Sequence, residues 1–290
     1  MQLDIFDHSR DVMLRNDVVH ALERRDWPAA VAAWEAFARE YPADESLPAL
    51  LTLVEAGQGE GQPAFRDHDA LRRTRLAAQD SVQPAAQRIF GDKAATTWLG
   101  PLWRDLAQRA TPLAFRRDNS EEHAAPLWLR AGDWNAAAAA VERIESWRRI
   151  PAPLTWMVQA RLRLYGLQAT WGMLAELAWL SPRRLDEVVR HTNEPMLQQL
   201  AHKFESSFEG VGDPSDLAWF PAWVLTERSA LAAHLALAQP SQHSAPEKAL
   251  RVLIELLGLE RQGRHHDVVA RRKTLRDIHL SLHAAYMKTR

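Results

Sequence analysis

The sequence predicts an all-α fold, and three observations lead to this prediction. Apolar side chains in residues 18–42 recur with a period of about 3.6, the period of an α-helix. Few glycines and hardly any runs of Val, Ile and Thr leave no stretch with the alternation typical of a strand. Prolines stand at the ends of the periodic runs, where they bound helices without breaking them. We therefore expect antiparallel helix hairpins along the chain.

Residues 18–42 predict two short helices packed back to back. The apolar stripe of the first helix is Leu14, Val18, Ala21 and Leu22, and that of the second is Ala30, Val31, Trp34, Phe37, Ala38 and Tyr41. Between the stripes, Asp26 can cap the second helix, and Pro28 fits its first turn without losing a needed N–H. Pro42 then ends the hairpin.

The spacing in this hairpin resembles a tetratricopeptide repeat, a helix pair of about 34 residues. Trp27 is the aromatic at the turn, Ala30 the small residue where the helices touch, Trp34 the packing aromatic and Pro42 the closing residue. Arg25 takes the place of the usual turn glycine. The resemblance implies hairpins stacked into a superhelix, an α-solenoid, whose concave face holds a peptide or protein partner.

A second copy of the pattern begins at Gly132-Asp133-Trp134, where the turn glycine is present. Ala137, Val141 and Ile144 occupy the same relative places, and Pro151 closes the copy two residues late. Residues 165–182 and 258–275 match the repeat pattern less well. The rest of the chain matches only as helix pairs.

Apolar periodicity and helix-end signals predict further helices along the chain. They lie at residues 45–56, 66–79, 83–90, 93–109, 153–165, 170–180, 183–191, 195–208, 222–238, 245–261 and 267–288. Residues 112–120 form the clearest internal break, and two subdomains, if there are two, meet there. Because solenoid repeats contact only their neighbours, we expect a single helical-repeat domain over residues 1–290.

Three local features have both a structural and a functional interpretation. The glycines of residues 57–61 suggest a phosphate loop, but no Lys-Ser/Thr pair comes after them and no strand precedes them, so a flexible connector is favoured. Arg72, Arg73 and Arg75 indicate a solvated helix face more than contact with an acidic partner. The aromatic run at residues 218–223 indicates core packing more than a ligand site.

Composition and charge exclude several classes of function. The chain has no cysteine, so it holds no disulfide, no cysteine-zinc site and no thiol nucleophile. Its formal net charge of −1 argues against a protein that coats nucleic acid generally. Residues 1–15 lack the long apolar run of a secretory signal, and the uncharged runs are too short or too polar to cross a membrane. We expect a cytoplasmic protein.

No motif for nucleophilic, zinc, phosphate or dinucleotide chemistry occurs in the sequence. We therefore expect no enzyme and no cofactor. The best metal pair is His279 and His283, one turn apart on the predicted last helix, but no carboxylate accompanies them as a zinc peptidase requires. Ordinary surface histidines are the favoured interpretation.

Positive charge gathers near the end of the chain. From Arg261 onwards there are eight Lys/Arg against two Asp. We define the basic ridge as the residues on this segment that are candidates for contacting a partner, namely Arg264, Arg272, Lys273, Arg276, His279 and His283. The ridge could hold an acidic peptide or a phosphate backbone. The plainer interpretation is that a terminal repeat needs a polar outer face for solubility.

The sequence supports three functional hypotheses. The first is a non-enzymatic adaptor or scaffold that binds a protein or peptide partner in its superhelical groove. The second is a nucleic-acid-associated accessory protein that uses the basic C-terminal helix. The third is an enzyme whose site is assembled from distant repeats, which leaves no local motif to find. None of the three involves a membrane.

Overall fold

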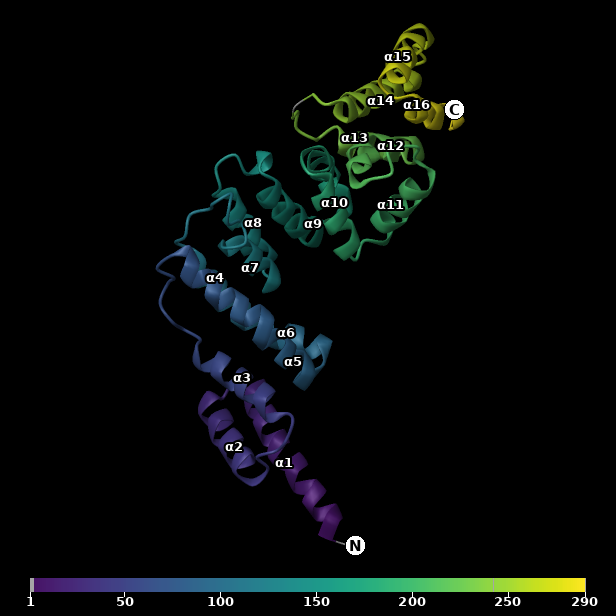
Figure 1. The fold of residues 1–290 in the computed structure, drawn as a ribbon. Helices are drawn as coiled ribbons and strands as arrows, with labels where there is room; N and C mark the ends of the chain where they lie inside the picture. Colours follow the sequence, from purple (N-terminus) through teal and green to yellow (C-terminus); the bar gives the residue numbers. More distant parts are fainter. Residues whose placement is uncertain (1–2, 242, 290) are drawn as a thin grey trace. The chain divides into compact units, whose positions relative to one another are not determined.

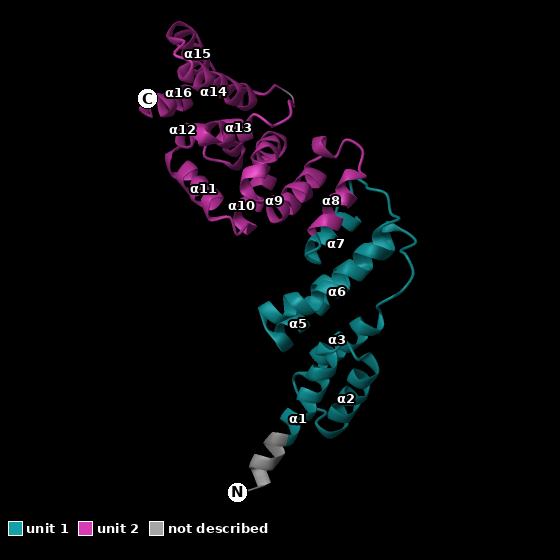
Figure 2. Cartoon of the chain, turned by 180° about the vertical axis from the view of Figure 1, so that it is seen from behind, with its two compact units in different colours: residues 1–133 teal, residues 134–290 magenta. Residues whose placement is uncertain are grey.

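The computed structural model is all-helical over the residues that it describes, which are 3–241 and 243–289, with side chains described from residue 10 onwards (Figure 1). No strand occurs in these ranges, which confirms the all-α prediction. The chain divides into two compact units, Met1–Asp133 and Trp134–Arg290, coloured separately in Figure 2. Within each unit, consecutive helices pack against one another, as helix pairs should.

The first unit is built from short helices. They are α1 (Leu3–Glu23), α2 (Trp27–Glu40), α3 (Leu47–Gln58), α4 (His68–Ala77), a π-helical turn (Ala78–Val82), α5 (Gln83–Phe90), α6 (Asp92–Ala110) and α7 (Ala124–Arg130). Helices α1 and α2 form the first predicted hairpin, with Asp26 accepting a hydrogen bond from the Ala29 N–H at 3.2 Å. The stripe residues Val18, Leu22, Ala30 and Phe37 are fully buried.

The two turns that resemble each other in sequence also share a backbone conformation. Arg25 has φ 56° and Gly132 has φ 73°, both left-handed. The next residues make the same bond, from Asp26 N to Ala21 O and from Asp133 N to Trp128 O, each at 3.0 Å. An arginine tolerates this conformation here because its guanidinium donates to Trp98 O at 3.0 Å and pairs with Glu60. Arg25 therefore has the left-handed backbone conformation that Gly132 has at the second turn.

Trp27 and Trp134, the aromatics of the two turns, are partly buried. Trp27 still packs closely, because a Cβ on Gly57 would come within 2.3 Å of its ring. Gly57 therefore belongs to the last turn of α3 and to the packing of the hairpin, whereas the sequence placed it in a flexible connector.

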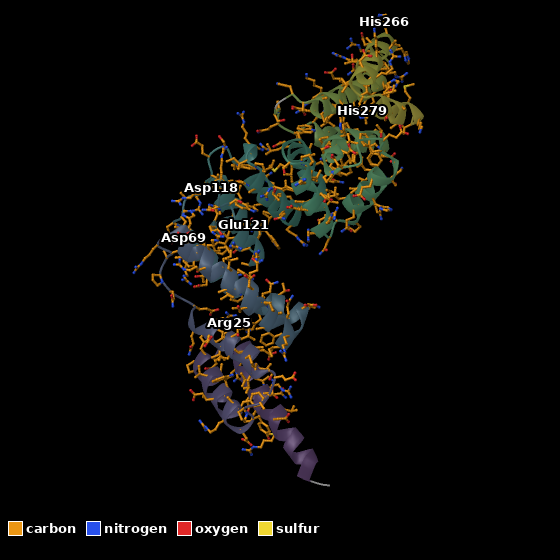
Figure 3. All side chains as sticks on the ribbon, viewed as in Figure 1. Arg25, Asp69, Asp118, Glu121, His266 and His279 are labelled. Atoms are coloured by element: carbon orange, nitrogen blue, oxygen red, sulfur yellow. The ribbon has the colours of Figure 1, made fainter. Side chains whose placement is uncertain are left out.

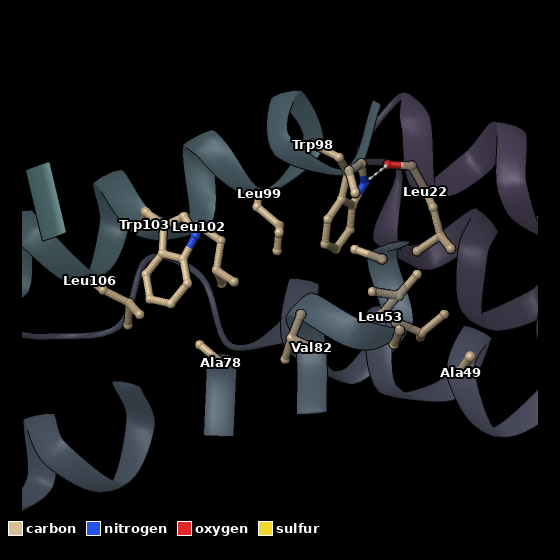
Figure 4. Close-up of a cluster of buried hydrophobic side chains, with 14 of the residues drawn as sticks. Leu22, Ala49, Leu53, Ala78, Val82, Trp98, Leu99, Leu102, Trp103 and Leu106 are labelled. Carbon is tan, nitrogen blue, oxygen red and sulfur yellow. Dashed lines mark hydrogen bonds between the residues drawn. The ribbon is translucent and has the colours of Figure 1, made fainter. Parts of the chain in front are cut away.

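The core of the first unit runs from α1 to α7, and Figure 4 shows part of it. The Trp98 indole donates to Leu22 O at 2.9 Å, which ties α6 to the end of α1. Leu53 of α3 and Leu106 of α6 are buried in the same cluster. Arg75, expected on a solvated face, is also buried, and pairs with Glu122 at 3.0 Å. That prediction was wrong for Arg75 because its charge is neutralised inside the unit.

The second unit contains longer helices and several single turns. They are α8 (Trp134–Glu142), the 3-10 turn η2 (Trp147–Arg149), α9 (Pro151–Leu180), α10 (Pro182–His191), α11 (Pro195–Ser207), the 3-10 turn η3 (Pro214–Trp219), α12 (Phe220–Glu227), the 3-10 turn η4 (Ser229–Leu231), α13 (Ala232–Leu235), α14 (Ala245–Arg261), α15 (His265–Ile278) and α16 (Leu280–Lys288). Helix α9 is kinked at Gly166, where φ is 75°, so the two helices predicted on either side of it are confirmed.

The boundary between the units lies after Asp133, inside the second predicted hairpin. Residues 112–120, where the sequence placed the clearest break, form an irregular connection between α6 and α7. The expectation of one continuous domain stays a prediction. None of the described helices is both long and apolar enough to cross a membrane.

The aromatic run near residue 220 is part of the core, as the favoured interpretation predicted. Phe220 and Trp223 are almost fully buried, and both contact the ring of Phe204, at 5.5 and 5.4 Å between ring centroids. The helix predicted at 222–238 is wrong in extent. It breaks at Arg228, which is neither Gly nor Pro, into α12, η4 and α13.

The single long helix predicted at 267–288 is also wrong. His279 has φ −156° and ψ 114°, so α15 ends before it and α16 begins after it. Its imidazole stacks on Phe208 and contacts Trp219, at 5.2 and 4.3 Å between centroids, and its Nδ1 accepts from Leu282 N at 3.2 Å. Packing and capping by this ring offset the loss of the helical conformation at His279. The expected stripe of Val268, Leu275, Leu282 and Tyr286 is nevertheless buried.

Candidate functional site

The basic ridge is divided by the break at His279, so its residues do not form one continuous flank. Arg264 is exposed and pairs with Asp267 at 2.7 Å. Lys273 and Arg276 are exposed on α15, and no ion pair joins either to another described residue. These three residues are the exposed part of the ridge.

Arg272 belongs to an internal cluster and is not free to contact a partner. Its guanidinium lies 3.2 Å from Glu260 Oε1 and donates to the Tyr286 hydroxyl at 3.3 Å. The Tyr286 hydroxyl in turn donates to Glu260. Burial, followed by the Glu260 hydrogen bond, raises the pKa of Tyr286. Arg272 thus joins α14, α15 and α16.

The two histidines of the ridge have different surroundings. Burial lowers the pKa of His279, and burial followed by the charges of Arg276 and Arg272 lowers that of His283. His279 Nδ1 is already used as the cap of α16. His266 lies at the outer end of α15, away from His279 (Figure 3). Over the part of the chain that is described, no three His, Asp or Glu residues gather as they would around a metal.

A groove of about 580 Å³ lies between α14 and α15. Its lining residues are Glu255, Gly258, Leu259, Gln262, Arg264, Asp267, Ala270, Arg271 and Thr274. Arg271 pairs with Glu255 at 2.9 Å across the groove, while Arg264 pairs with Asp267 on one helix. Only Arg264 of the basic ridge lines it. The sequence missed Glu255 and Arg271, which are brought together only when the two helices pack.

A second pocket, of about 310 Å³, lies where the end of α9 meets η2 and the connection from α13 to α14. We call it the Trp179 pocket. Its lining residues are Arg148, Arg149, Glu176, Trp179, Leu180, Gln239, Pro240, Ser241 and Ser244. Glu176 is almost fully buried, and burial raises its pKa. The adjacent Arg148-Arg149 pair after Trp147 is the only signal for this pocket in the sequence.

A third pocket, also of about 310 Å³, is lined by several carboxylates near η3. These carboxylates already have local structural roles. Asp186 pairs with Arg190 at 2.8 Å, and Asp216 accepts from Val211 N and Gly212 N at 2.9 and 2.7 Å. Asp213 caps η3 through Ser215 N at 2.7 Å. The cluster therefore holds the loop of residues 209–216 in place.

The fold and these sites define an all-α protein of paired helices with an open, mixed-charge groove. Comparisons with protein-family models, with curated proteins and with solved structures find no match. The geometry of the chain itself is therefore the basis for assigning a function.

Proposed function

We propose that this chain is a non-enzymatic helical-repeat adaptor, with its hairpins stacked as a superhelix resembling tetratricopeptide repeats, that binds a protein partner. The observation that carries the proposal is the α14–α15 groove, whose volume of about 580 Å³ falls within the range of sites that enclose a ligand. An extended segment of the partner would occupy it. The shared turn geometry at Arg25 and Gly132 supports the repeat interpretation.

The chemistry of the groove suits a peptide because a peptide presents charges of both signs together with backbone amides. Glu255 and Asp267 offer carboxylates, and Arg264 and Arg271 offer guanidinium groups. The ion pairs among them are about half exposed, so each contributes only about 0–1 kcal/mol. A partner can therefore replace them with its own contacts at small cost. Gln262 and Thr274 add groups that bind a peptide backbone.

A nucleic-acid partner is the second candidate, and the charges of α14–α16 favour it less. Residues 245–289 carry nine Lys/Arg and five Asp/Glu. Four of the arginines are each paired with a carboxylate: Arg251, Arg264, Arg271 and Arg272. A phosphate backbone laid over the groove would meet Glu255 and Asp267 as well as the cations. These ion pairs reduce the number of free cations that can take part in counterion release.

The test is affinity purification of the full chain from native cell extract at low and moderate salt, with and without nuclease. A protein partner that survives both treatments is the expected result, because mixed-charge and backbone contacts are less sensitive to salt than phosphate contacts. Nucleic acid that is lost when the salt is raised would favour the second candidate. The absence of any specific partner would overturn the proposal.

Two charge-reversal double variants test where the partner binds. Replacing Arg264 and Arg271 together with Glu reverses the cations of the groove and should remove the partner. Replacing Lys273 and Arg276 together with Glu reverses as many charges outside the groove lining and should leave a groove-bound partner in place. The opposite pattern would move the contact to the basic ridge. Because all four side chains are exposed, neither double variant should unfold the protein.

A further inference from the structure

The Trp179 pocket has more hydrogen-bond donors than acceptors available to a ligand. Both oxygens of Glu176 are engaged: Oε1 accepts from Gln239 N at 2.8 Å, and Oε2 lies 3.1 Å from Arg148 Nε. Glu247, just behind the lining, accepts from Ser241 N and His243 N at 3.1 and 3.0 Å. The carboxylates at this site therefore have little capacity left for a ligand.

Two donors at the pocket, by contrast, are buried without a hydrogen bond. The Trp179 indole N–H is buried and has no hydrogen-bond partner in the structure. Arg148 Nε is also buried without a hydrogen bond, although it forms an ion pair with Glu176 Oε2 at 3.1 Å. Arg149 is exposed at the pocket, and no ion pair is found for it among the described residues. A buried donor without an acceptor costs about 1–3 kcal/mol, and an acceptor-bearing ligand would remove that cost.

The remaining walls and charges restrict the ligand further. Arg251 lies over the Trp179 ring at 5.8 Å and donates to Ala238 O at 2.7 Å, so its positive charge lies behind the indole. Around the pocket there are thus three positive charges, on Arg148, Arg149 and Arg251, and two carboxylates, Glu176 and Glu247. Trp179, Leu180 and Pro240 supply apolar surface beside these donors. The site suits an anion attached to an apolar group.

We propose that the Trp179 pocket binds a carboxylate with an apolar group next to it, with Arg149, Arg148 and the Trp179 indole as donors. This chemistry has two sources, a free small organic acid and the C-terminal residue of a bound polypeptide. The pocket volume of about 310 Å³ holds a group of either kind. The second source would rest on the proposed adaptor function, and the first would not.

The probe is N-acetyl-leucine, compared with its neutral amide N-acetyl-leucinamide, by calorimetric titration of the full chain. The acid should bind and the amide should bind about tenfold more weakly, since a charge-assisted hydrogen bond is worth a factor of this order. The tripeptide Ala-Ala-Leu distinguishes the sources: tighter binding than the N-acetyl acid indicates a polypeptide end, and equal or weaker binding indicates a free acid. Inorganic phosphate binding in place of the acid would overturn the carboxylate assignment.

Two variants test the donors without removing a recorded hydrogen bond or ion pair. Trp179→Phe keeps an aromatic ring beside Arg251 and deletes an N–H that has no partner, and Arg149→Gln removes an exposed charge. Each should weaken binding of the acid about tenfold. Trp171→Phe is the matched control, because its indole N–H is also buried and unsatisfied but lies outside the pocket lining. Arg143→Gln, at an exposed arginine that does not line the pocket, is the charge control.

A spectroscopic signal gives a second readout. The indole N–H resonance of Trp179, assigned by its loss in Trp179→Phe, should move downfield when the acid is added, because the N–H gains an acceptor. Saturable binding of the acid with this shift in the wild type, about tenfold weaker binding in the two pocket variants and unchanged binding in the two controls are the expected results. No saturable binding at millimolar acid, equal binding of acid and amide, or equal losses in pocket and control variants would each overturn the proposal, whether or not a protein partner is found.

Discussion

Arg272 shows how a residue that the sequence places on a surface can instead hold helices together. It was expected to be a free cation of the basic ridge, yet it contacts Glu260 and Tyr286. Glu260 lies on α14 and Tyr286 on α16, so no local pattern around Arg272 could reveal them. The side chains of Arg272 and Glu260 are 31% and 20% exposed, which makes the pair more enclosed than those of the groove. Its role is therefore structural.

We predict that Arg272→Glu lowers the free energy of unfolding by about 1–2 kcal/mol, because it leaves Glu260 and Tyr286 without the cation and places a second carboxylate beside them. Lys273→Glu, the next residue, is exposed and without an ion pair, and should change stability by less than about 0.5 kcal/mol. Urea denaturation of both variants measures the difference. Equal stabilities would show that the Arg272 cluster contributes nothing.

His279 should make stability depend on pH. Burial lowers its pKa below the ordinary value of 6.5, with nearby Asp216 acting in the opposite direction. Between pH 6.5 and the lower pKa of the folded protein, the unfolded chain binds more protons than the folded chain. The contribution of neutral His279 to the free energy of unfolding is therefore present above pH 6.5 and is lost as the pH falls through the folded-state pKa. Protonation would also remove the acceptor that caps α16.

The test is the pH dependence of unfolding in His279→Asn, since Asn can cap a helix but does not titrate in this range. The variant should lose some stability at all pH values through lost ring contacts, and should lose less than the wild type when the pH is lowered. His283, whose pKa is also lowered, remains in both proteins and cancels in the comparison. If the free energy of unfolding changed with pH by the same amount in both proteins, His279 would not be the group responsible.

At the scale of the element, the first hairpin depends on a close contact between Trp27 and Gly57. A Cβ at Gly57 would overlap ring atoms of Trp27, and Gly57 lies in the last turn of α3. We predict that Gly57→Ala lowers the free energy of unfolding by about 1–3 kcal/mol through overpacking, although alanine is the better helix former. Gly258→Ala in α14, where nothing lies within 4 Å of the added Cβ, is the matched control and should not destabilise. Stabilisation by both changes would mean that Trp27 does not pack on α3.

The elements also show which structural features a sequence can predict. Helices α5 and α6 match the predicted ranges closely, and Arg25 adopts a left-handed conformation at the turn where the sequence pattern placed it. These features depend on local periodicity. The break at His279 has no Gly or Pro signal and depends on Phe208 and Trp219, which are distant in sequence. A local pattern cannot foresee a helix end that tertiary packing decides.

At the scale of the whole molecule, paired helices could be predicted, and the pockets could not. The Trp179 pocket joins Arg148, Glu176 and Gln239, and the α14–α15 groove joins Glu255 to Arg271. Within each set the residues are separated in sequence and become neighbours only through folding. Of the basic ridge, Arg264 lines the α14–α15 groove and the other five residues do not. The charge composition pointed to the C-terminal segment but did not identify the side chains that line the α14–α15 groove.

The central claim is that a protein partner occupies the α14–α15 groove, and photo-cross-linking tests it most directly. A photoreactive side chain at Ala270, which is exposed and lines the groove, is compared with one at Ala284, which is exposed on α16 and does not line it. After irradiation in native extract treated with nuclease, we predict a discrete protein adduct from position 270 and none from position 284. Adducts of equal yield from both positions, or no protein adduct from position 270, would contradict the account.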